Sequence, residues 1–387
     1  MEVFLHSNSN EVKVYWHYSE PGSAYSKPYL VDASALRECC TGVRTALTSL
    51  NEYVRGNPNL TDDLDPQWKA YHRILSELRM HGALLRAALI GAGEPEDAAT
   101  LFDQRLHALE ADVPITFHCS DQGVTIPLGF VFDGHPSVTT AKPSKSDFDG
   151  FWINRFKLGI RLSGTDCRTS TPIDTEQFNA LYALNKEETG KVMAEFAEAE
   201  RKKFALLTSI ALRDHYNWDQ VGQACLKLQQ SHAVFFVFAH SDGRTLRLAD
   251  ADNISWEKLR SILQRRIDAP GHNTDAARKI DPVGLVILNC CASAAGATGK
   301  SLLSSVTQPG FCGLIGTESE IANVAAMRCG LHLMWNLCVK GMKLGDAFFD
   351  MQNLQDLFPL NLLYTFYAAR DFQLRQPVQF ATALEVT

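Results

Sequence analysis

The sequence lacks any long uninterrupted apolar segment. No stretch reaches the roughly 18 apolar residues that a membrane-spanning helix requires. The N-terminal residues MEVFLHSNSNEVKVYW also lack the basic start, apolar centre and small-residue cleavage site of a secretory signal. We therefore expect a cytoplasmic protein with no membrane partner.

Regularly spaced metal ligands are also missing. The ten cysteines form no Cys-x-x-Cys pair and no His/Cys cluster with the spacing of zinc ligands. Adjacent cysteines, such as Cys39 with Cys40, make poor disulfide partners, so we expect reduced thiols. The segment GATGKS lacks the first glycine of a phosphate-binding loop, because Ala294 stands in its place. The sequence thus predicts no metal and no cofactor, and an ATPase is excluded.

Basic residues are too few for a nucleic-acid-binding protein. The chain has 37 Lys and Arg against 44 Asp and Glu, a net charge of -7. This is the wrong sign for a protein that holds phosphates, and we expect no direct binding to nucleic acid. Protein substrates and a regulatory or sensor protein are the expected partners.

What the chain does have is enough apolar sequence for a sizeable core, 45% of 387 residues. Residues 1–112 are expected to form an N-terminal hairpin and a helical region, with helices over 33–54, 67–90 and 97–109. Residues 113–387 are expected to form a second domain. A further helix is predicted over 186–207.

Three continuous apolar runs in the second half predict strands that are buried on both faces. They are AVFFVFAH (233–240), GLVILNCC (284–291) and GFCGLIGT (310–317). Helical patterns follow the runs, as over 325–338. Strands that alternate with helices predict an α/β fold with a mostly parallel central sheet flanked by helices. In such sheets, binding sites form beyond the carboxyl ends of the strands.

Two of these strand ends carry a histidine and a cysteine. His240 closes one run, and Cys291 closes the next, 51 residues further along (291 minus 240). A thiol is only a few per cent ionised at neutral pH, so a neighbouring imidazole is needed to activate it. The small residues that follow Cys291 leave backbone amides accessible to an oxyanion. The pair can act as the general base and nucleophile of a cysteine hydrolase.

The segments FFVFAHSDG, LVILNCCASAAG, GLIGTESEIANVAAM and FPLNLLYTFYAARDF resemble the CHAT family of caspase-like proteases. The resemblance covers about residues 114–372. It implies a caspase-hemoglobinase fold of the caspase and separase clan. It also implies a His-Cys dyad and an endopeptidase that cleaves a specific partner protein in bacterial signalling or defence, antiviral defence included.

The resemblance assigns the nucleophile to Cys291 and the general base to His240. Cys290 stands beside the nucleophile, and adjacent strand residues point to opposite faces, so motif register selects Cys291. In the family a glycine directly follows the histidine, whereas here two residues separate His240 from Gly243. The oxyanion hole is predicted at the backbone amides of Gly243 and Cys291.

Three acidic residues follow strand ends on the predicted catalytic side: Asp242, Glu318 and Glu320. They could form a substrate-binding pocket for a basic side chain, and the alternative is that they are ordinary solvated loop acids. His118 and Cys119 are adjacent on a strand and are interpreted as structural. A catalytically silent scaffold or binding module is the first alternative to a protease, and a hydrolase or transferase with a small-molecule thioester intermediate is the second.

Overall fold

The computed structural model describes residues 1–7, 10–17, 25–57, 65–90, 98–110, 113–119, 125–134, 144–162, 179–209, 214–215, 217–227, 233–242, 245–249, 252–255, 257–259, 261, 285–294 and 313–374. The chain divides into two compact units. Unit 1 comprises Met1–Ser163 and Glu318–Glu320, and unit 2 comprises Gly164–Thr317 and Ile321–Thr387. Among the described residues, no helix combines the length and apolar character that crossing a membrane requires.

Unit 1 contains a five-stranded sheet in the order β3-β2-β1-β4-β5. Its strands are β1 (Glu2–Ser7), β2 (Glu11–His17), β3 (Tyr29–Asp32), β4 (Pro114–Cys119) and β5 (Lys157–Leu162). β1 pairs antiparallel with β2, which confirms the predicted hairpin, and parallel with β4. The domain boundary predicted after residue 112 stays a prediction. In the structure, β4 and β5, which follow that boundary, belong to the sheet of unit 1.

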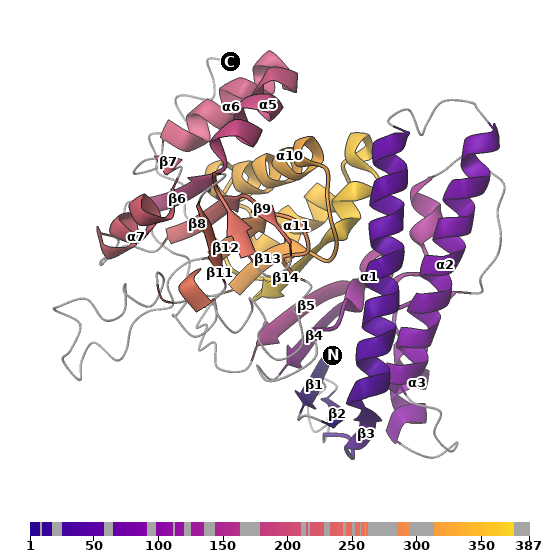
Figure 1. Ribbon diagram of the computed structural model, residues 1–387. Helices are drawn as coiled ribbons and strands as arrows, with labels where there is room; N and C mark the ends of the chain where they lie inside the picture. Colours follow the sequence, from indigo (N-terminus) through magenta and orange to yellow (C-terminus); the bar gives the residue numbers. More distant parts are fainter. Residues whose placement is uncertain are drawn as a thin grey trace, which may run out of the picture. The chain divides into compact units, whose positions relative to one another are not determined.

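The helices of unit 1 are α1 (Ala33–Gly56), α2 (Asp65–Ile90), α3 (Ala98–Ala108) and the single-turn α4 (Trp152–Arg155), with short 3-10 turns at Leu128–Phe130 and Lys145–Phe148. The three long helices confirm the predicted helical region. α1 and α2 lie side by side (Figure 1). The Asp32 carboxylate caps α1 by accepting a hydrogen bond from the Ala35 N–H at 2.7 Å. A buried stripe at helical spacing runs along α1: Leu36, Cys40, Val43, Leu47 and Leu50.

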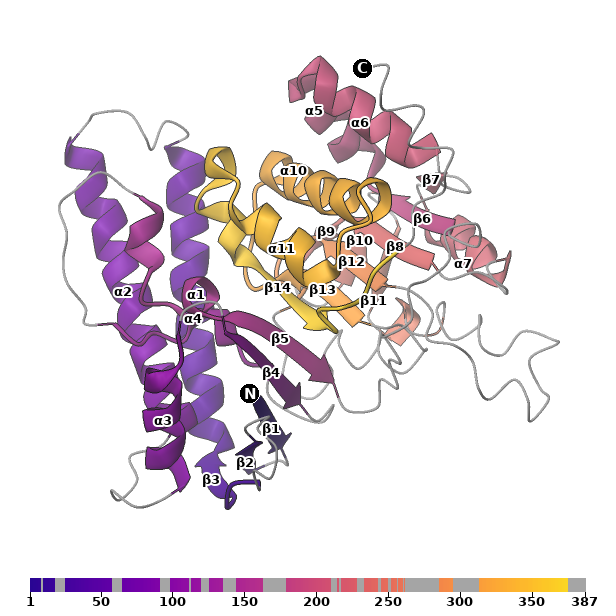
Figure 2. The ribbon, with the colours of Figure 1, turned by 180° about the vertical axis from the view of Figure 1, so that it is seen from behind.

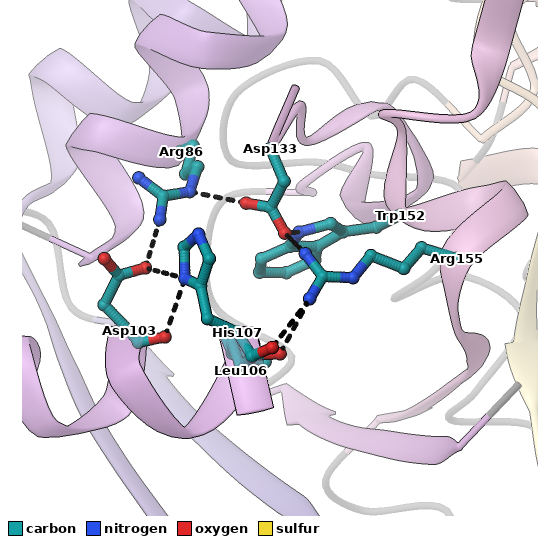
Figure 3. Close-up of polar contacts among 7 residues, drawn as sticks. All are labelled: Arg86, Asp103, Leu106, His107, Asp133, Trp152 and Arg155. Atoms are coloured by element: carbon teal, nitrogen blue, oxygen red, sulfur yellow. Dashed lines mark hydrogen bonds and ion pairs between the residues drawn. The ribbon is translucent and has the colours of Figure 1, made fainter. Parts of the chain in front are cut away.

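A buried carboxylate, Asp133, connects the helices of unit 1 (Figure 3). It accepts hydrogen bonds from the Arg86 Nε at 2.5 Å, the Trp152 Nε1 at 2.9 Å and the Arg155 guanidinium. Arg155 also donates to the Leu106 carbonyl at 3.1 Å, near the end of α3, where carbonyls lack partners within the helix. The two arginines compensate the buried charge, and the network fixes α2, α3 and α4 to one another.

Unit 2 contains a six-stranded sheet in the order β14-β13-β12-β8-β6-β7. Its strands are β6 (Asn179–Leu184), β7 (Asp214–His215), β8 (Ala233–Phe238), β12 (Leu285–Asn289), β13 (Gly313–Thr317) and β14 (Tyr364–Ala368). β14 pairs antiparallel with β13, and the other neighbouring pairs are parallel. β8, β12 and β13 confirm the strands predicted from the three apolar runs. A small second sheet contains β9 (His240–Ser241), β10 (Thr245–Arg247) and β11 (Asn253–Ser255).

The helices of unit 2 are α5 (Lys186–Glu195), α6 (Glu198–Ser209), α7 (Trp218–Lys227), α10 (Asn323–Met334) and α11 (Leu344–Gln352), with a π-helical turn at Trp335–Val339 and 3-10 turns at Gln355–Leu357 and Leu360–Leu363. α10 and α11 pack against each other beside the sheet (Figure 2). α5 and α6 confirm the helical region predicted over 186–207, and the structure divides it into two helices that are interrupted at residues 196–197. There the Glu200 carboxylate caps the Ala197 N–H at 2.8 Å and begins a new helix.

Candidate active site

The predicted histidine and cysteine lie at the carboxyl ends of neighbouring parallel strands. In the register of β8 and β12, Phe238 is the partner of Asn289. His240 and Cys291 each follow two residues after these partners, since 240 minus 238 and 291 minus 289 are both two. Adjacent strands are about 4.8 Å apart, so the register brings the two residues to the same edge of the sheet. This is the edge at which α/β folds place their sites.

The chain turns sharply directly after the cysteine. Ala292 has a φ of +51°, in the left-handed region that non-glycine residues rarely adopt. Such strained residues cluster at functional sites, where the surrounding structure holds them in place. The Cys291 Sγ lies 3.8 Å from the Ile321 carbonyl oxygen, within hydrogen-bond range for sulfur. The thiol is half-buried. The strained turn therefore presents a partly accessible thiol at the strand end.

Buried hydrogen bonds hold this turn against the end of β13. The Ser293 hydroxyl donates to the Leu288 carbonyl at 2.9 Å and accepts from the Thr317 N–H at 2.9 Å. The Thr317 hydroxyl donates to the Cys290 carbonyl at 2.8 Å. The Ala294 N–H donates to the Thr317 carbonyl at 2.8 Å. These bonds to both sides of the cysteine preorganise the loop in a region without bulk water.

The two adjacent cysteines have different surroundings. The Cys290 side chain is buried in the core, and burial raises its pKa well above that of an ordinary thiol. A thiol in such a setting is inert, because the thiolate is the nucleophile. Cys291 is half-buried and lies near a backbone carbonyl. This contrast supports the choice of Cys291 that motif register made.

A glutamate that the sequence analysis missed lies beside the histidine. The Glu188 Oε1 is 3.5 Å from the His240 Nε2. The same carboxylate accepts hydrogen bonds from the Lys191 Nζ at 2.9 Å and the Asn323 Nδ2 at 2.5 Å. Partial burial raises the pKa of Glu188, but the hydrogen bonds from Lys191 and Asn323, with His240 nearby, outweigh it and lower the pKa overall. The carboxylate is therefore ionised at neutral pH.

The position of Glu188 in the sequence is itself a signal, because it lies in the first turn of α5, the helix that follows β6. β6 pairs with β8, so its carboxyl end lies at the same sheet edge. Asn185, at the N-cap of α5, accepts from the Glu188 N–H at 3.0 Å. The Asn185 N–H in turn donates to the Phe238 carbonyl at 2.7 Å, which ties the start of α5 to the end of β8, two residues before His240.

The three acidic residues predicted to bind substrate have different settings. Asp242 accepts hydrogen bonds from the Thr245 N–H at 2.7 Å and from the Thr245 hydroxyl at 3.2 Å. Glu318 is fully buried, and its Oε2 lies 3.0 Å from the Arg44 Nη2 and 3.1 Å from the Arg44 Nε. Glu320 is exposed.

The units divide these acids, because Asp242 belongs to unit 2 and Glu318 and Glu320 to unit 1. The predicted substrate pocket, which needs all three acids together, stays a prediction. Gly243, the other predicted oxyanion residue, lies outside the described residues.

Comparisons with known proteins bear on the fold. No protein-family model matches the sequence, and the search of curated proteins gives no match. Two crystal structures of the Saccharomyces cerevisiae separase–securin complex match 97% and 95% of this chain, with TM-scores of 0.51 and 0.50 and 8% identity. The fold is caspase-like. The chain spans 30% of the matched separase chain.

A further match is the Arg-specific cysteine proteinase gingipain R, with a TM-score of 0.44 and 10% identity over 73% of this chain and 70% of that one. At 8% identity, the resemblance to the separase chain shows the arrangement of the backbone and no more.

Proposed function

We propose that the chain is a cysteine endopeptidase in which Cys291 is the nucleophile and His240 is the acid-base partner. The observation that carries the proposal is the register of β8 and β12, which brings both residues to one sheet edge of a caspase-like fold. The strained turn at Ala292 and the burial of Cys290 support the assignment of the nucleophile. A histidine and a cysteine with purely structural roles would require neither the strained turn nor the difference in burial between the two cysteines.

In the proposed reaction, the imidazole of His240 takes the thiol proton and the Cys291 thiolate attacks the scissile carbonyl. Backbone amides at Cys291 and Gly243 stabilise the oxyanion. His240 then protonates the leaving amine, and a thioester remains on the enzyme. Water attacks this thioester with His240 as the base, and the free thiol is regenerated as the carboxylic acid product leaves.

The proposed substrate is a specific partner protein, cleaved in the cytoplasm in a bacterial defence or signalling pathway, as the resemblance to the CHAT family implies. The matched separase is bound to securin, which supports the expectation of a regulatory protein partner here. We also propose a preference for a basic residue before the scissile bond. Exposed Glu320 is the acid with which to test this preference, since Glu318 already pairs with Arg44.

A peptide-library cleavage profile of the parent and four variants tests the proposal. Cys291→Ala and His240→Ala should abolish cleavage, whereas Cys290→Ala should retain it because Cys290 is a buried thiol. Glu320→Lys should lower cleavage after Lys or Arg by about tenfold, or about 1.4 kcal/mol of transition-state binding. Cleavage that survives Cys291→Ala would overturn the assigned nucleophile. A parent that cleaves no peptide and does not react with a cysteine-directed probe would favour the silent scaffold.

A further inference from the structure

We propose that Glu188 is a positioning residue for the catalytic pair, and this inference rests on the proposed function. The carboxylate lies 3.5 Å from the His240 Nε2. Nε2 and Nδ1 are the two ring nitrogens, and the group beside one of them selects which nitrogen carries the proton in the neutral ring. A carboxylate beside Nε2 favours the tautomer with a proton there. That tautomer leaves Nδ1 as the base for the thiol.

The position of Glu188 is itself fixed by residues that flank His240. Asn185 accepts from the Glu188 N–H at 3.0 Å and donates its own N–H to the Phe238 carbonyl, two residues before the histidine. Its side-chain Nδ2 lies 3.4 Å from the carbonyl oxygen of Arg247, which pairs with His240 across β9 and β10. One asparagine therefore connects the helix that carries Glu188 to β8, which precedes the histidine, and to β10, which pairs with it.

The same carboxylate is connected to the cysteine side of the site. Its Oε2 accepts from the Asn323 Nδ2 at 2.5 Å. Asn323 begins α10, two residues after Ile321, whose carbonyl oxygen is 3.8 Å from the Cys291 Sγ. Glu188 thus lies between the segment that contacts the thiol and the ring that would deprotonate it. This arrangement suits a residue that fixes the two groups with respect to each other.

Charge gives Glu188 a second effect. When the thiol proton moves to His240, a thiolate and an imidazolium form, and the nearby carboxylate stabilises the imidazolium. Lys191 and Asn323 hold the carboxylate ionised. The ion pair should therefore persist at a pH at which an isolated thiol is protonated. Replacement of Glu188 should lower the reactivity of Cys291 at acidic pH and leave it nearly unchanged at alkaline pH, where the thiolate forms unaided.

The chain offers a matched control for this experiment. Glu187 is the preceding residue on α5 and also pairs with Lys191, at 2.7 Å, but its side chain is 67% exposed. Glu187→Gln removes the same charge from the same helical turn. The change in net charge and the loss of an ion pair with Lys191 are therefore common to Glu187→Gln and Glu188→Gln.

The experiment measures the alkylation rate of Cys291 by iodoacetamide at pH 6 and pH 9, read by mass spectrometry in a Cys290→Ala background. An ordinary thiol of pKa about 8.5 reacts roughly 200-fold more slowly at pH 6 than at pH 9. The parent should show a difference of less than about tenfold. Glu188→Gln should lower the pH 6 rate by at least about tenfold and the pH 9 rate by less than about twofold. Glu188→Asp should restore part of the loss, and Glu187→Gln should match the parent.

The outcomes separate this inference from the proposed function. If the parent has the ratio of an ordinary thiol and His240→Ala does not change it, the catalytic pair itself is wrong. If the parent is activated and His240→Ala abolishes the activation, but Glu188→Gln matches Glu187→Gln, the pair stands and the role of Glu188 is overturned. Equal losses at both pH values in Glu188→Gln would indicate structural damage and would also overturn the positioning role.

Discussion

Ser293 accepts a hydrogen bond from the Thr317 backbone N–H at 2.9 Å, and this contact ties the loop after β12 to the end of β13. Both residues are buried, so no water replaces the bond when it is lost. The serine lies two residues after the proposed nucleophile. A side chain without catalytic chemistry thus determines how the loop that carries Cys291 is held.

Ser293→Ala should lower the free energy of unfolding by about 1–3 kcal/mol, because a buried N–H loses its acceptor. Urea unfolding measures this change. Ser319→Ala is the control, since Ser319 is also buried but its hydroxyl donates to the adjacent Glu320 carbonyl. If Ser293→Ala lowers the free energy of unfolding no more than Ser319→Ala does, the Ser293–Thr317 hydrogen bond does not hold the loop.

Ala292 supplies a test of the strained turn. Ala292→Gly should raise the free energy of unfolding by up to about 1 kcal/mol, because glycine adopts a φ of +51° without a steric penalty. Ala292→Val should lower it by more than about 1 kcal/mol, since a β-branched side chain is poorly tolerated in this region. Thermal and urea unfolding should agree on the order glycine, alanine, valine. The reverse order would mean that the left-handed conformation does not exist in solution.

The Arg44–Glu318 pair predicts a strongly non-additive double-mutant cycle. Arg44→Met should lower the free energy of unfolding by about 2–4 kcal/mol, because it leaves the fully buried carboxylate without its cation. The double variant Arg44→Met with Glu318→Leu should recover a large part of this loss, since no charge then remains buried. If the changes in the free energy of unfolding of the two single variants sum to that of the double variant, the two side chains do not interact.

Stability should be sensitive to replacement of Asp133 in unit 1. Its carboxylate is 5% exposed and lies between Arg86 and Arg155, so Asp133→Asn should lower the free energy of unfolding by about 2–3 kcal/mol. Exposed Asp149 is the control, and Asp149→Asn should change stability by less than about 0.5 kcal/mol. Equal effects of the two substitutions would remove the structural role assigned to the network.

The lowered pKa of Glu188 predicts a specific loss of stability in acid. A carboxyl group with a pKa below its ordinary value of 4.5 stabilises the native state above that pH, and the contribution disappears as the pH falls through the native pKa. Between pH 7 and pH 3.5, the free energy of unfolding should therefore fall further in the parent than in Glu188→Gln. If the free energy of unfolding depends on pH in the same way in both proteins, the lowered pKa of Glu188 is contradicted.

The sequence predicted the parts of the fold that depend on local pattern. β8, β12 and β13 are continuous apolar runs, and such runs need no knowledge of the rest of the chain. Because sites in α/β folds form at the carboxyl ends of strands, the ends of β8 and β12 predicted functional roles for His240 and Cys291. Motif register selected Cys291 over Cys290, and only the structure shows that one thiol is buried and the other half-buried.

What the sequence could not predict depends on contacts between distant residues. Arg44 and Glu318 are 274 positions apart, and no local pattern indicates that a helix near the N-terminus supplies a cation to that glutamate. Glu188 resembles any other acid in the first turn of a helix until its distance to His240 is measured. The φ of Ala292 is equally hidden, because alanine rarely adopts that conformation and carries no signal for it.

The division of the chain into units limits how the protein can be dissected. Glu318–Glu320 is part of unit 1, although Thr317 before it and Ile321 after it belong to unit 2. A single cut after Ser163 therefore does not separate two self-contained halves. A fragment that begins at Gly164 keeps Glu318 but loses Arg44, so the carboxylate loses the cation that pairs with it. Shortened versions of the protein should carry Glu318→Gln, or should be produced by co-expression of both pieces.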